Sequence, residues 1–436
     1  MLILFSVKNF RSIRDEQELS LVAAPDRTRD GVEAQLIRYE LPGLSGKRFL
    51  HSAAIFGANG SGKSNLIDAL CMMQELVLKS ASYSPDRRLP YSPFALDHES
   101  AQKPTDCFIA FVWENIRYEY RFSYNEEAIV EEKLCSFPRG SRRTLFSRTI
   151  GPSGHSLLRG SSSVPISHAI ASMLNPNTLL LSLVFHHPGM PGSAAIKPAG
   201  DFFKNALAIP DWKKDLTATF PSTGELLDGS PSDGYQQRFV QRMMRCSDLG
   251  ISSAAVVRKP ISLGVWNTTM AMQKTVVFEH MGVNGSADIE YQAESSGTQQ
   301  LFSLSASIGS AFQNQGTLIV DGLDAFLHPM LATEIVRLFE RPGQTQPVQL
   351  IFTALDPVFM QHDLLGRDQI WLADKDASGS TSISPLLDYL PREGEPLASG
   401  YLLGRYGGVP VLSGDFGSLP FNQIQAHSAE KVQGRK

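Results

Sequence analysis

The sequence predicts an α/β protein in which two α/β segments flank a long mixed β/α insert. In the first segment, "FLHSAAIFG" at 49–57 has the composition of a strand, and helical periodicity follows a glycine-rich turn from 63 to 81. The second segment begins near residue 294 and alternates helices and strands again. The sequence between them has neither an internal repeat nor sustained heptads, so we expect a globular insert without a long coiled coil.

Composition limits the class of protein. The chain has 436 residues, 42% of them hydrophobic and 19% charged, which is typical of a globular protein with a large core. A net charge of −4 gives no global positive field for nucleic acid. Apolar runs such as 179–185 are too short to span a bilayer, and the opening residues lack the basic start of a signal peptide, so we expect a cytoplasmic protein. The cysteines are scattered and predict reduced thiols; they are Cys71, Cys107, Cys135 and Cys246.

The elements before the second α/β segment follow from local patterns. "LILFSVKNF" at 2–10 alternates apolar and polar residues and predicts a strand. Alternation around an asparagine-containing turn predicts an antiparallel meander at 105–134. Residues 136–165 are rich in Gly, Ser and Arg and are expected to form a loop, whereas helices are expected from 166 to about 250.

The second α/β segment supplies the remaining expected elements. Its pattern predicts helices at 299–312 and 329–340, and strands at 317–321, 348–353 and 368–373. The two α/β segments are expected to join into one domain.

"GANGSGKS" at 57–64 matches the phosphate-binding loop pattern in full, after a strand and before a helix. Its glycines let backbone N–H groups face phosphates, Lys63 reaches the β- and γ-phosphates, and Ser64 can bind Mg²⁺. The pattern predicts ATP as a bound nucleotide. The residues expected at the nucleotide from this stretch are Gly57, Asn59, Gly60, Gly62, Lys63, Ser64 and Asn65.

"TLIVDGLDAFLHP" at 317–329 supplies the expected metal carboxylate. An apolar strand ends in Asp321, which we expect to bind Mg²⁺ together with Ser64. The next position is where an ATPase of this kind carries a general base, and here it is Gly322.

A third motif completes a recognisable set. "ESSGTQQLFSLSASI" at 294–308 opens a helix with residues that leave backbone donors free for an anion. The three motifs come in the order and spacing of ABC-type ATPase heads. Together with "FSVKNFRSIRDEQELSLVA" at the start and "GYLLGRYGGVP" at 400–410, they make nearly the whole chain resemble the SMC/RecF-like AAA-family ATPases of bacterial anti-phage defence operons. Relatives of this kind are found in PARIS, Septu, retron and nuclease-linked systems.

The resemblance implies an ABC-type head that dimerises through composite ATP sites. One subunit would hold MgATP, while Ser296 and Gly297 of a second subunit close over the γ-phosphate. Arg11 lies where related heads place a residue near the nucleotide, although an exposed hairpin arginine is an equal alternative. No glutamine after the first helix matches the Q-loop of such heads.

Two positions depart from the family pattern. Relatives carry Glu where this chain has Gly322, and a switch His where "FTALDP" places Leu355. Losing a positioned general base costs about 10²–10⁴ in rate, so we expect slow or absent hydrolysis. Asp324 is a weak candidate for a substitute base, and His328 is expected to be structural or at a dimer contact. Pairing with an intact paralogue would leave one hydrolytic site.

The expected domain organisation has four parts. Residues 1–90 and 291–412 form the two parts of the ATPase head, 91–290 form a strand arm and a mostly helical insert, and 413–436 form a polar tail. Two groups of basic residues could contact nucleic acid, although solvated surface positions explain them more simply. They are Arg139, Arg142 and Arg143 in the expected loop, and Arg238, Arg242 and Arg245 on one helix face.

The sequence therefore favours an ATP-binding regulatory or scaffold subunit of a defence system. It would self-associate through the head and control a partner effector, expected to be a nuclease from the same operon. The alternative is a RecF/SMC-like DNA-binding ATPase of repair or recombination, and a third possibility is a structural protein with a static nucleotide.

Overall fold

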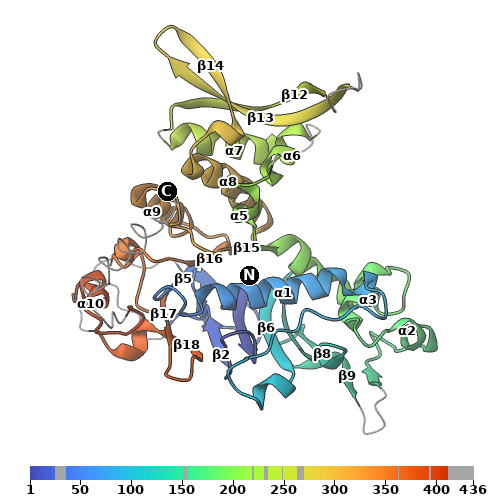
Figure 1. Cartoon of the computed structure of the whole chain (residues 1–436). Helices are drawn as coiled ribbons and strands as arrows, with labels where there is room; N and C mark the ends of the chain where they lie inside the picture. Colours follow the sequence, from blue (N-terminus) through green and yellow to red (C-terminus); the bar gives the residue numbers. More distant parts are fainter. Residues whose placement is uncertain are drawn as a thin grey trace, which may run out of the picture.

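The structure is a computed structural model that describes residues 1–24, 36–150, 156–218, 220–229, 234–247, 249–262, 270–361, 363–391 and 394–410. A broad lower body contains two large sheets, and a smaller upper lobe, formed by the described residues between 222 and 314, stands above it (Figure 1). The expected tail at 413–436 lies outside the described residues.

A six-stranded sheet carries the phosphate loop and Asp321, the expected metal carboxylate. In spatial order its strands are β11 (Leu207–Ala208), β15 (Thr317–Val320), β16 (Gln349–Thr353), β5 (Ser52–Phe56), β17 (Ile370–Lys375) and β18 (Thr381–Pro385). The first five are parallel and β18 is antiparallel. Because parallel strands end at one edge, the loops that follow β5, β15, β16 and β11 meet there. The strands expected in the two α/β segments are confirmed.

A seven-stranded antiparallel sheet forms the second layer. In spatial order its strands are β10 (Ser156–Gly160), β9 (Arg143–Ile150), β8 (Ile129–Phe137), β7 (Ile116–Tyr124), β6 (Thr105–Trp113), β1 (Leu2–Lys8) and β2 (Gln17–Ser20). The expected meander at 105–134 is confirmed. Because β6 pairs with β1, strands on both sides of residue 90 belong to the same sheet. The domain boundary expected at residue 90 remains a proposal. A separate two-stranded pair consists of β3 (Ile37–Arg38) and β4 (Arg48–Phe49).

The loop expected over 136–165 is wrong for much of its length. Strand β9 pairs with β8, and β10 pairs with β9. The local composition is polar, but Leu145 and Phe146 are buried against the core. Pairing with a preceding strand therefore overrides the loop composition, since β structure depends on its partners more than on local sequence.

Helices are present in each region where the sequence predicted them. Their bounds are α1 (Lys63–Lys79), α2 (His168–Met173), α3 (Leu180–His186), α4 (Ser193–Asp201), α5 (Trp212–Asp215), α6 (Ser222–Asp228), α7 (Gly234–Cys246), α8 (Ser296–Asn314), α9 (Pro329–Phe339) and α10 (Leu397–Leu402). Residues 251–262 and 270–290 form a three-stranded sheet in the upper lobe that the sequence pattern did not predict. Its strands are β12 (Ile251–Ser262), β13 (Met270–Gly282) and β14 (Gly285–Glu290), with α6 and α7 beneath them (Figure 1).

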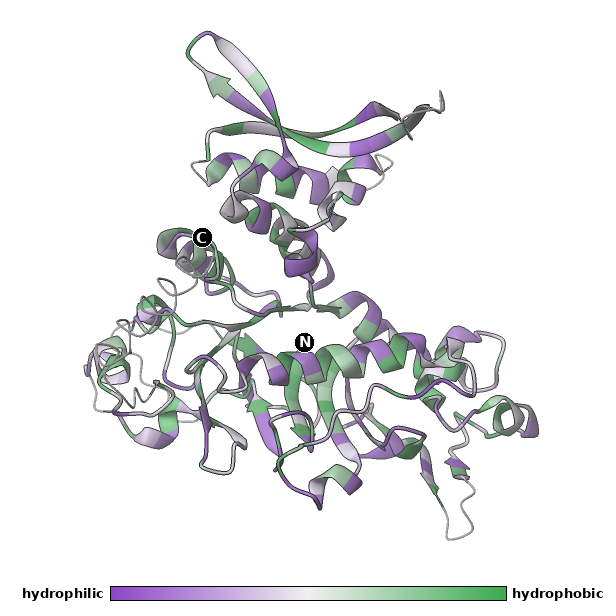
Figure 2. Cartoon of the chain, in the orientation of Figure 1, coloured by the Kyte–Doolittle hydropathy of each residue, from purple (hydrophilic) through white to green (hydrophobic). Residues whose placement is uncertain are grey.

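The parallel sheet lies between two apolar cores. Ile55 and Ile319 pack into a core shared with α1 and the antiparallel sheet. Phe56 and Val320, the next residues on the same strands, pack into a core shared with α8 and α9. Successive strand residues point to opposite faces, so both faces of these strands are buried. Figure 2 shows hydrophobic residues concentrated on α1 and the strands beside it.

A buried glutamine joins the two sheets. Gln349, on β16, accepts a hydrogen bond from Leu2 N at 2.7 Å and donates to the carbonyl oxygens of Leu2 at 3.0 Å and Leu50 at 3.1 Å. The backbone groups at the start of β1 are thus satisfied by a side chain of the parallel sheet. This contact helps to hold β1, and with it the antiparallel sheet, against the strands that carry the site.

Candidate functional site

The phosphate loop connects β5 to α1 in a conformation that requires glycine. Gly62 has a φ of +104° immediately before the first residue of α1. A Cβ atom there would lie 2.1 Å from Thr381 Oγ1, which is closer than any side chain tolerates. Thr381 Oγ1 in turn donates to Ser61 O at 2.8 Å, so β18 supports the loop from the side.

Lys63, the first residue of α1, bonds to the loop itself. Its Nζ donates to Gly57 O at 2.8 Å and to Ala58 O at 2.9 Å. Burial lowers the pKa of Lys63, although the nearby carboxylates of Asp321 and Asp324 oppose that shift. The ammonium group is therefore held at the position where the loop would surround phosphate oxygens.

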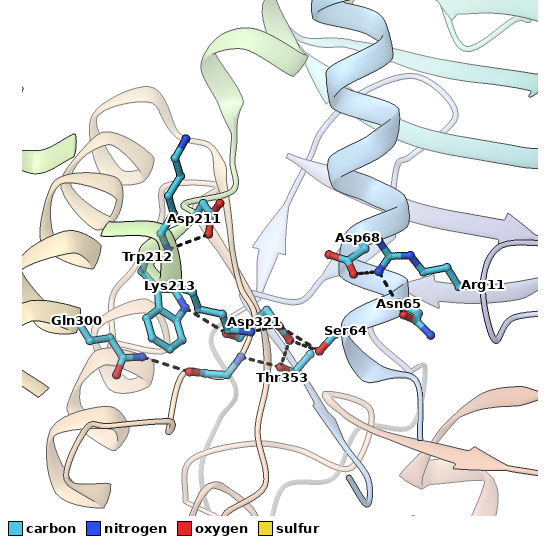
Figure 3. Close-up of polar contacts among 12 residues, drawn as sticks. Arg11, Ser64, Asn65, Asp68, Asp211, Trp212, Lys213, Gln300, Asp321 and Thr353 are labelled. Carbon is cyan, nitrogen blue, oxygen red and sulfur yellow. Dashed lines mark hydrogen bonds and ion pairs between the residues drawn. The ribbon is translucent and has the colours of Figure 1, made fainter. Parts of the chain in front are cut away.

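Asp321, directly after β15, accepts hydrogen bonds from three sides (Figure 3). Ser64 Oγ lies 2.9 and 3.1 Å from its two carboxylate oxygens, and Thr353 Oγ1 donates to Oδ1 at 2.8 Å. The third donor is the ammonium group of Lys213, from α5. Burial alone would raise the pKa of Asp321, but the bonds it accepts, led by that from Lys213, outweigh burial and lower it.

These groups surround a pocket of about 320 Å³. It is lined by Asn59, Gly60, Gly62, Lys63, Ser64, Asn65, Lys213, Asp321, Gly322, Asp324, Ala325, Thr353, Ala354 and Leu355. Most of the phosphate-loop residues expected at the nucleotide therefore meet Asp321 in one place. Gly57 contributes through its carbonyl bond to Lys63. Arg11, Ser296 and Gly297 are not among the lining residues.

Arg11 lies against α1, beside the pocket. Its guanidinium forms an ion pair with Asp68, and its Nη1 lies 3.4 Å from Asn65 Oδ1 (Figure 3). Asn65 also donates to Ser12 Oγ at 2.6 Å, so the turn after β1 is attached to the start of α1. The structure places Arg11 next to a pocket-lining residue, and its contact with a nucleotide remains a prediction.

Ser296 and Gly297 are the first two residues of α8, and of these Ser296 is exposed and Gly297 is partly buried. Ser295 caps this helix by accepting a hydrogen bond from Thr298 N at 3.2 Å. A Cβ atom on Gly297 would lie 2.8 Å from Phe326 O, so glycine lets the loop after β15 approach the helix closely. The buried Gln300, one turn further along, donates to Gly322 O at 3.2 Å and accepts from Phe326 N at 3.1 Å.

The backbone conformation at position 322 favours glycine. Gly322 has a φ of +76°, a region that other L-residues adopt at a cost in free energy. Its N–H donates to Thr353 Oγ1 at 2.7 Å, and its carbonyl accepts from Gln300. Leu355, the residue in the expected switch position, is half exposed and lines the pocket with an apolar side chain.

The carboxylate of Asp324 is anchored to the neighbouring loop. Its Oδ2 accepts hydrogen bonds from Leu355 N and Asp356 N, each at 2.7 Å. Asp324 lines the pocket, and the two backbone donors fix the orientation of its carboxylate. His328 caps α9, where its Nδ1 accepts from Met330 N at 3.2 Å and Pro329 is the first helical residue. A structural role for His328 is thus supported.

Sequence reasoning missed two residues of this site. Thr353 ends β16 and could have been found as a hydroxyl at the carboxyl end of a predicted strand. Lys213 gives no such signal, because it is one of two adjacent lysines in an irregular stretch of the insert. It reaches Asp321 only because β11 pairs with β15 and ends at the same edge.

The oxygen atoms of Ser64 and Asp321 suit Mg²⁺, which prefers hydroxyl and carboxylate ligands alongside phosphate oxygens. When bound with a nucleotide, the metal neutralises phosphate charge. Within the described residues, no cluster of three or more His, Cys, Asp or Glu could hold a metal ion by itself. The chain's own contribution is therefore the pair Ser64 and Asp321, which Thr353 orients.

Comparison with known families identifies the domain. The chain matches the family described as "AAA domain, putative AbiEii toxin, Type IV TA system" over residues 52–157 and 214–358, more than half of its length. It belongs to this AAA-domain family. The matched residues include the phosphate loop, Asp321 and the start of α8, and AAA-family ATPase domains bind nucleotides through such a loop.

Solved structures with a similar arrangement include two Smc heads. One is the SmcHead bound to the C-winged helix domain of ScpA, at 14% identity and a TM-score of 0.44, covering 88% of this chain and 96% of that one. The other is a Smc head with an extended coiled coil bound to the C-terminal domain of ScpA, derived from Pyrococcus furiosus, at 13% identity and a TM-score of 0.41, covering 89% and 97%. No curated protein matches the chain. None of the helices in the described part of the chain is both long and apolar enough to cross a bilayer.

Proposed function

We propose that this AAA-domain protein is an ATP-binding switch with slow or absent hydrolysis, acting as a regulatory or scaffold subunit of an anti-phage defence system. The observation that carries the proposal is a phosphate pocket with the binding groups in place and Gly322 at the position of the general base. Lys63, Ser64 and Asp321 supply what nucleotide binding needs. Gly322 and Leu355 offer no side chain that could activate water or contact a γ-phosphate.

The proposed switch acts by ATP-dependent self-association. At the start of α8, Ser296 is exposed and Gly297 is partly buried, and the backbone N–H groups of a helix start favour an anion. In the proposed dimer, these residues of one copy close over the γ-phosphate bound by the other copy. Bound ATP then holds two subunits together for as long as hydrolysis is slow.

The family description supports a link to the control of a harmful activity, because it names a toxin and a type IV TA system. In this proposal the destructive chemistry belongs to a partner effector, a nuclease from the same operon, and the ATP-bound assembly controls it. The insert offers the surface on which such a partner would be held.

The test is to measure ATP affinity and ATP turnover on the purified protein, with Lys63→Ala as the control. We expect Lys63-dependent binding, with turnover slower by about 10²–10⁴ than an intact site of this type would give. Turnover at the rate of an ordinary ATPase, if abolished by Lys63→Ala, contradicts the switch. A matching loss in Asp324→Asn would then identify Asp324 as the base.

A DNA-binding ATPase is the second candidate, and a groove in the upper lobe favours it. Arg238, Arg242 and Arg245 are exposed on one face of α7 and line a groove of about 790 Å³ together with part of β12. No described residue forms an ion pair with any of the three. Arginines along a groove that form no ion pair with a described residue are suited to phosphate groups.

Duplex DNA binding at several salt concentrations tests this second candidate. If the groove binds DNA, replacing the three arginines by Gln weakens binding and lowers the slope of log affinity against log salt by about 3. The other predicted arginine group is not available in the same way, because Arg142 pairs with Glu119 and Arg143 contacts Ser163. Affinity unchanged in the triple variant argues against DNA in this groove.

A further inference from the structure

Lys213 reaches the nucleotide pocket from the insert and not from any of the ATPase motifs. Strand β11 pairs in parallel with β15, and the chain leaves β11 at the edge where Asp321 lies. Five residues later, the exposed side chain of Lys213 points back to Asp321 and joins the pocket lining (Figure 3). The pocket therefore contains two ammonium groups, those of Lys63 and Lys213.

The residue before Lys213 fixes this geometry. Trp212 is 2% exposed, and its Nε1 donates to Asp321 O at 3.1 Å. Its ring also lies 6.0 Å from that of Phe326, in an edge-to-face arrangement. One side chain thus binds the backbone of Asp321 while the next binds its carboxylate. Two adjacent contacts to the same residue distinguish this arrangement from a chance surface ion pair, which is held by a single mobile side chain.

The ammonium group occupies a position that a divalent cation would also require. Ser64 and Thr353 donate to the carboxylate of Asp321, and the ammonium group of Lys213 forms an ion pair with it. A metal ion held between Ser64 and Asp321 would have to share this carboxylate with an ammonium group. Like charges so close repel, so both cations cannot be held there with full affinity.

We propose that Lys213 is a tethered cation that takes the place of a divalent metal at Asp321, so that the triphosphate is bound by two lysines and Mg²⁺ competes with Lys213. This rests on the proposed nucleotide binding and deepens it. ATP carries several negative charges, and Lys63 with Lys213 can neutralise part of them without a metal. The insert then contributes directly to the nucleotide site, through the short segment that links β11 to the upper lobe.

The experiment compares ATP affinity in Mg²⁺ with ATP affinity in EDTA, using a fluorescent ATP analogue. The variants are Lys213→Ala and Lys213→Gln, and the matched control is Lys214→Ala, which removes the adjacent exposed lysine of the same helix. A second readout is Mn²⁺ binding to each protein with ATP, followed by electron paramagnetic resonance. Lys63→Ala serves as the control for nucleotide binding itself.

We expect wild-type affinity to change by less than about threefold between the two conditions. Both Lys213 variants should lose about tenfold or more in EDTA, recover in Mg²⁺, and bind Mn²⁺ about tenfold more tightly than the wild type, since the competing charge is gone. Lys214→Ala should behave as the wild type.

Three results overturn the inference. The wild type could require Mg²⁺ as strongly as the Lys213 variants do, or those variants could lose affinity equally in both conditions, or they could match the wild type throughout. If Lys63-dependent binding is present, such a result contradicts the proposed role of Lys213 and leaves the proposed function standing. If no condition gives Lys63-dependent binding, the proposed function fails together with this inference.

Discussion

Gly322 illustrates how a single residue is matched to its backbone. Its φ of +76° allows its N–H to reach Thr353 Oγ1, which in turn orients Asp321. The absence of a glutamate at this position is thus accompanied by a backbone conformation that a glutamate would adopt only with strain. A simple Gly322→Glu replacement is therefore not expected to restore an ordinary catalytic site.

Backbone strain at this position predicts a measurable loss of stability. A Cβ at residue 322 would have only ordinary contacts, 3.7 Å from Ala325 Cβ and 3.8 Å from the ring of Trp212, so the cost falls on the backbone. Gly322→Ala should lower the free energy of unfolding by about 1–2 kcal/mol, and Gly322→Asn by less, because asparagine tolerates the left-handed region. Denaturant unfolding measures both.

Gly189 provides the matched control. It has open space around it and a backbone that does not favour glycine, so Gly189→Ala should be neutral or slightly stabilising. Equal unfolding free energies for the wild type and Gly322→Ala would show that the left-handed conformation of residue 322 costs nothing.

At the scale of elements, helix α8 is coupled to the loop that follows β15. Gln300 is fully buried and bonds to Gly322 O and Phe326 N, on both sides of the turn that follows Asp321. Gly297 allows the same loop to pack against the start of the helix. Contacts within one chain therefore couple the position of α8 to the position of Asp321.

Removing this coupling should affect both stability and nucleotide binding. Gln300→Ala removes the acceptor of Phe326 N and one of the two donors to Gly322 O, which also accepts from Ala325 N at 3.2 Å. The variant should cost about 1–3 kcal/mol in unfolding free energy. It should also weaken ATP binding, because the loop that carries Asp321 is no longer fixed. Gln299→Ala is the control: this side chain is nearly buried on the same helix but donates to Tyr291 O, away from that loop. Equal effects of both variants on ATP affinity would contradict the coupling.

At the scale of the whole molecule, the motifs lie on one edge of a sheet while the exposed start of α8 belongs to the upper lobe. Ser296 and Gly297 are not among the residues that line the phosphate pocket of their own chain. In the proposed ATP-dependent dimer, the start of α8 from a second copy closes this pocket.

This arrangement predicts that ATP controls the oligomeric state. Sedimentation of the wild type should show a dimer with ATP and a smaller species without it. Ser296→Arg should remain in the smaller form, since a bulky charged side chain blocks the approach, yet keep Lys63-dependent ATP binding. Ser141→Arg, an exposed position between β8 and β9, should dimerise normally. An ATP-bound dimer of the Ser296 variant would rule out this interface.

The local parts of the fold and site could be predicted because neighbouring residues determine them. The glycines and Lys63 fix the phosphate loop, helical periodicity fixes α1, and Pro329 marks the first residue of α9. The apolar strand that ends in Asp321 was likewise recognisable. For each of these elements the chemical requirement lies within a few residues of the sequence.

By itself, then, the sequence determined a phosphate loop, an apolar strand that ends in Asp321, and an α/β framework to hold them. Only the tertiary structure decided that residues 143–150 and 156–160 are strands, that 251–262 and 270–290 form the sheet of the upper lobe, and that Lys213 lies on Asp321. The physical reason is shared by all three. A strand is stabilised by its partners, and a charged side chain acquires a role from the groups that distant strands bring to it, so neither is encoded in the residues alongside.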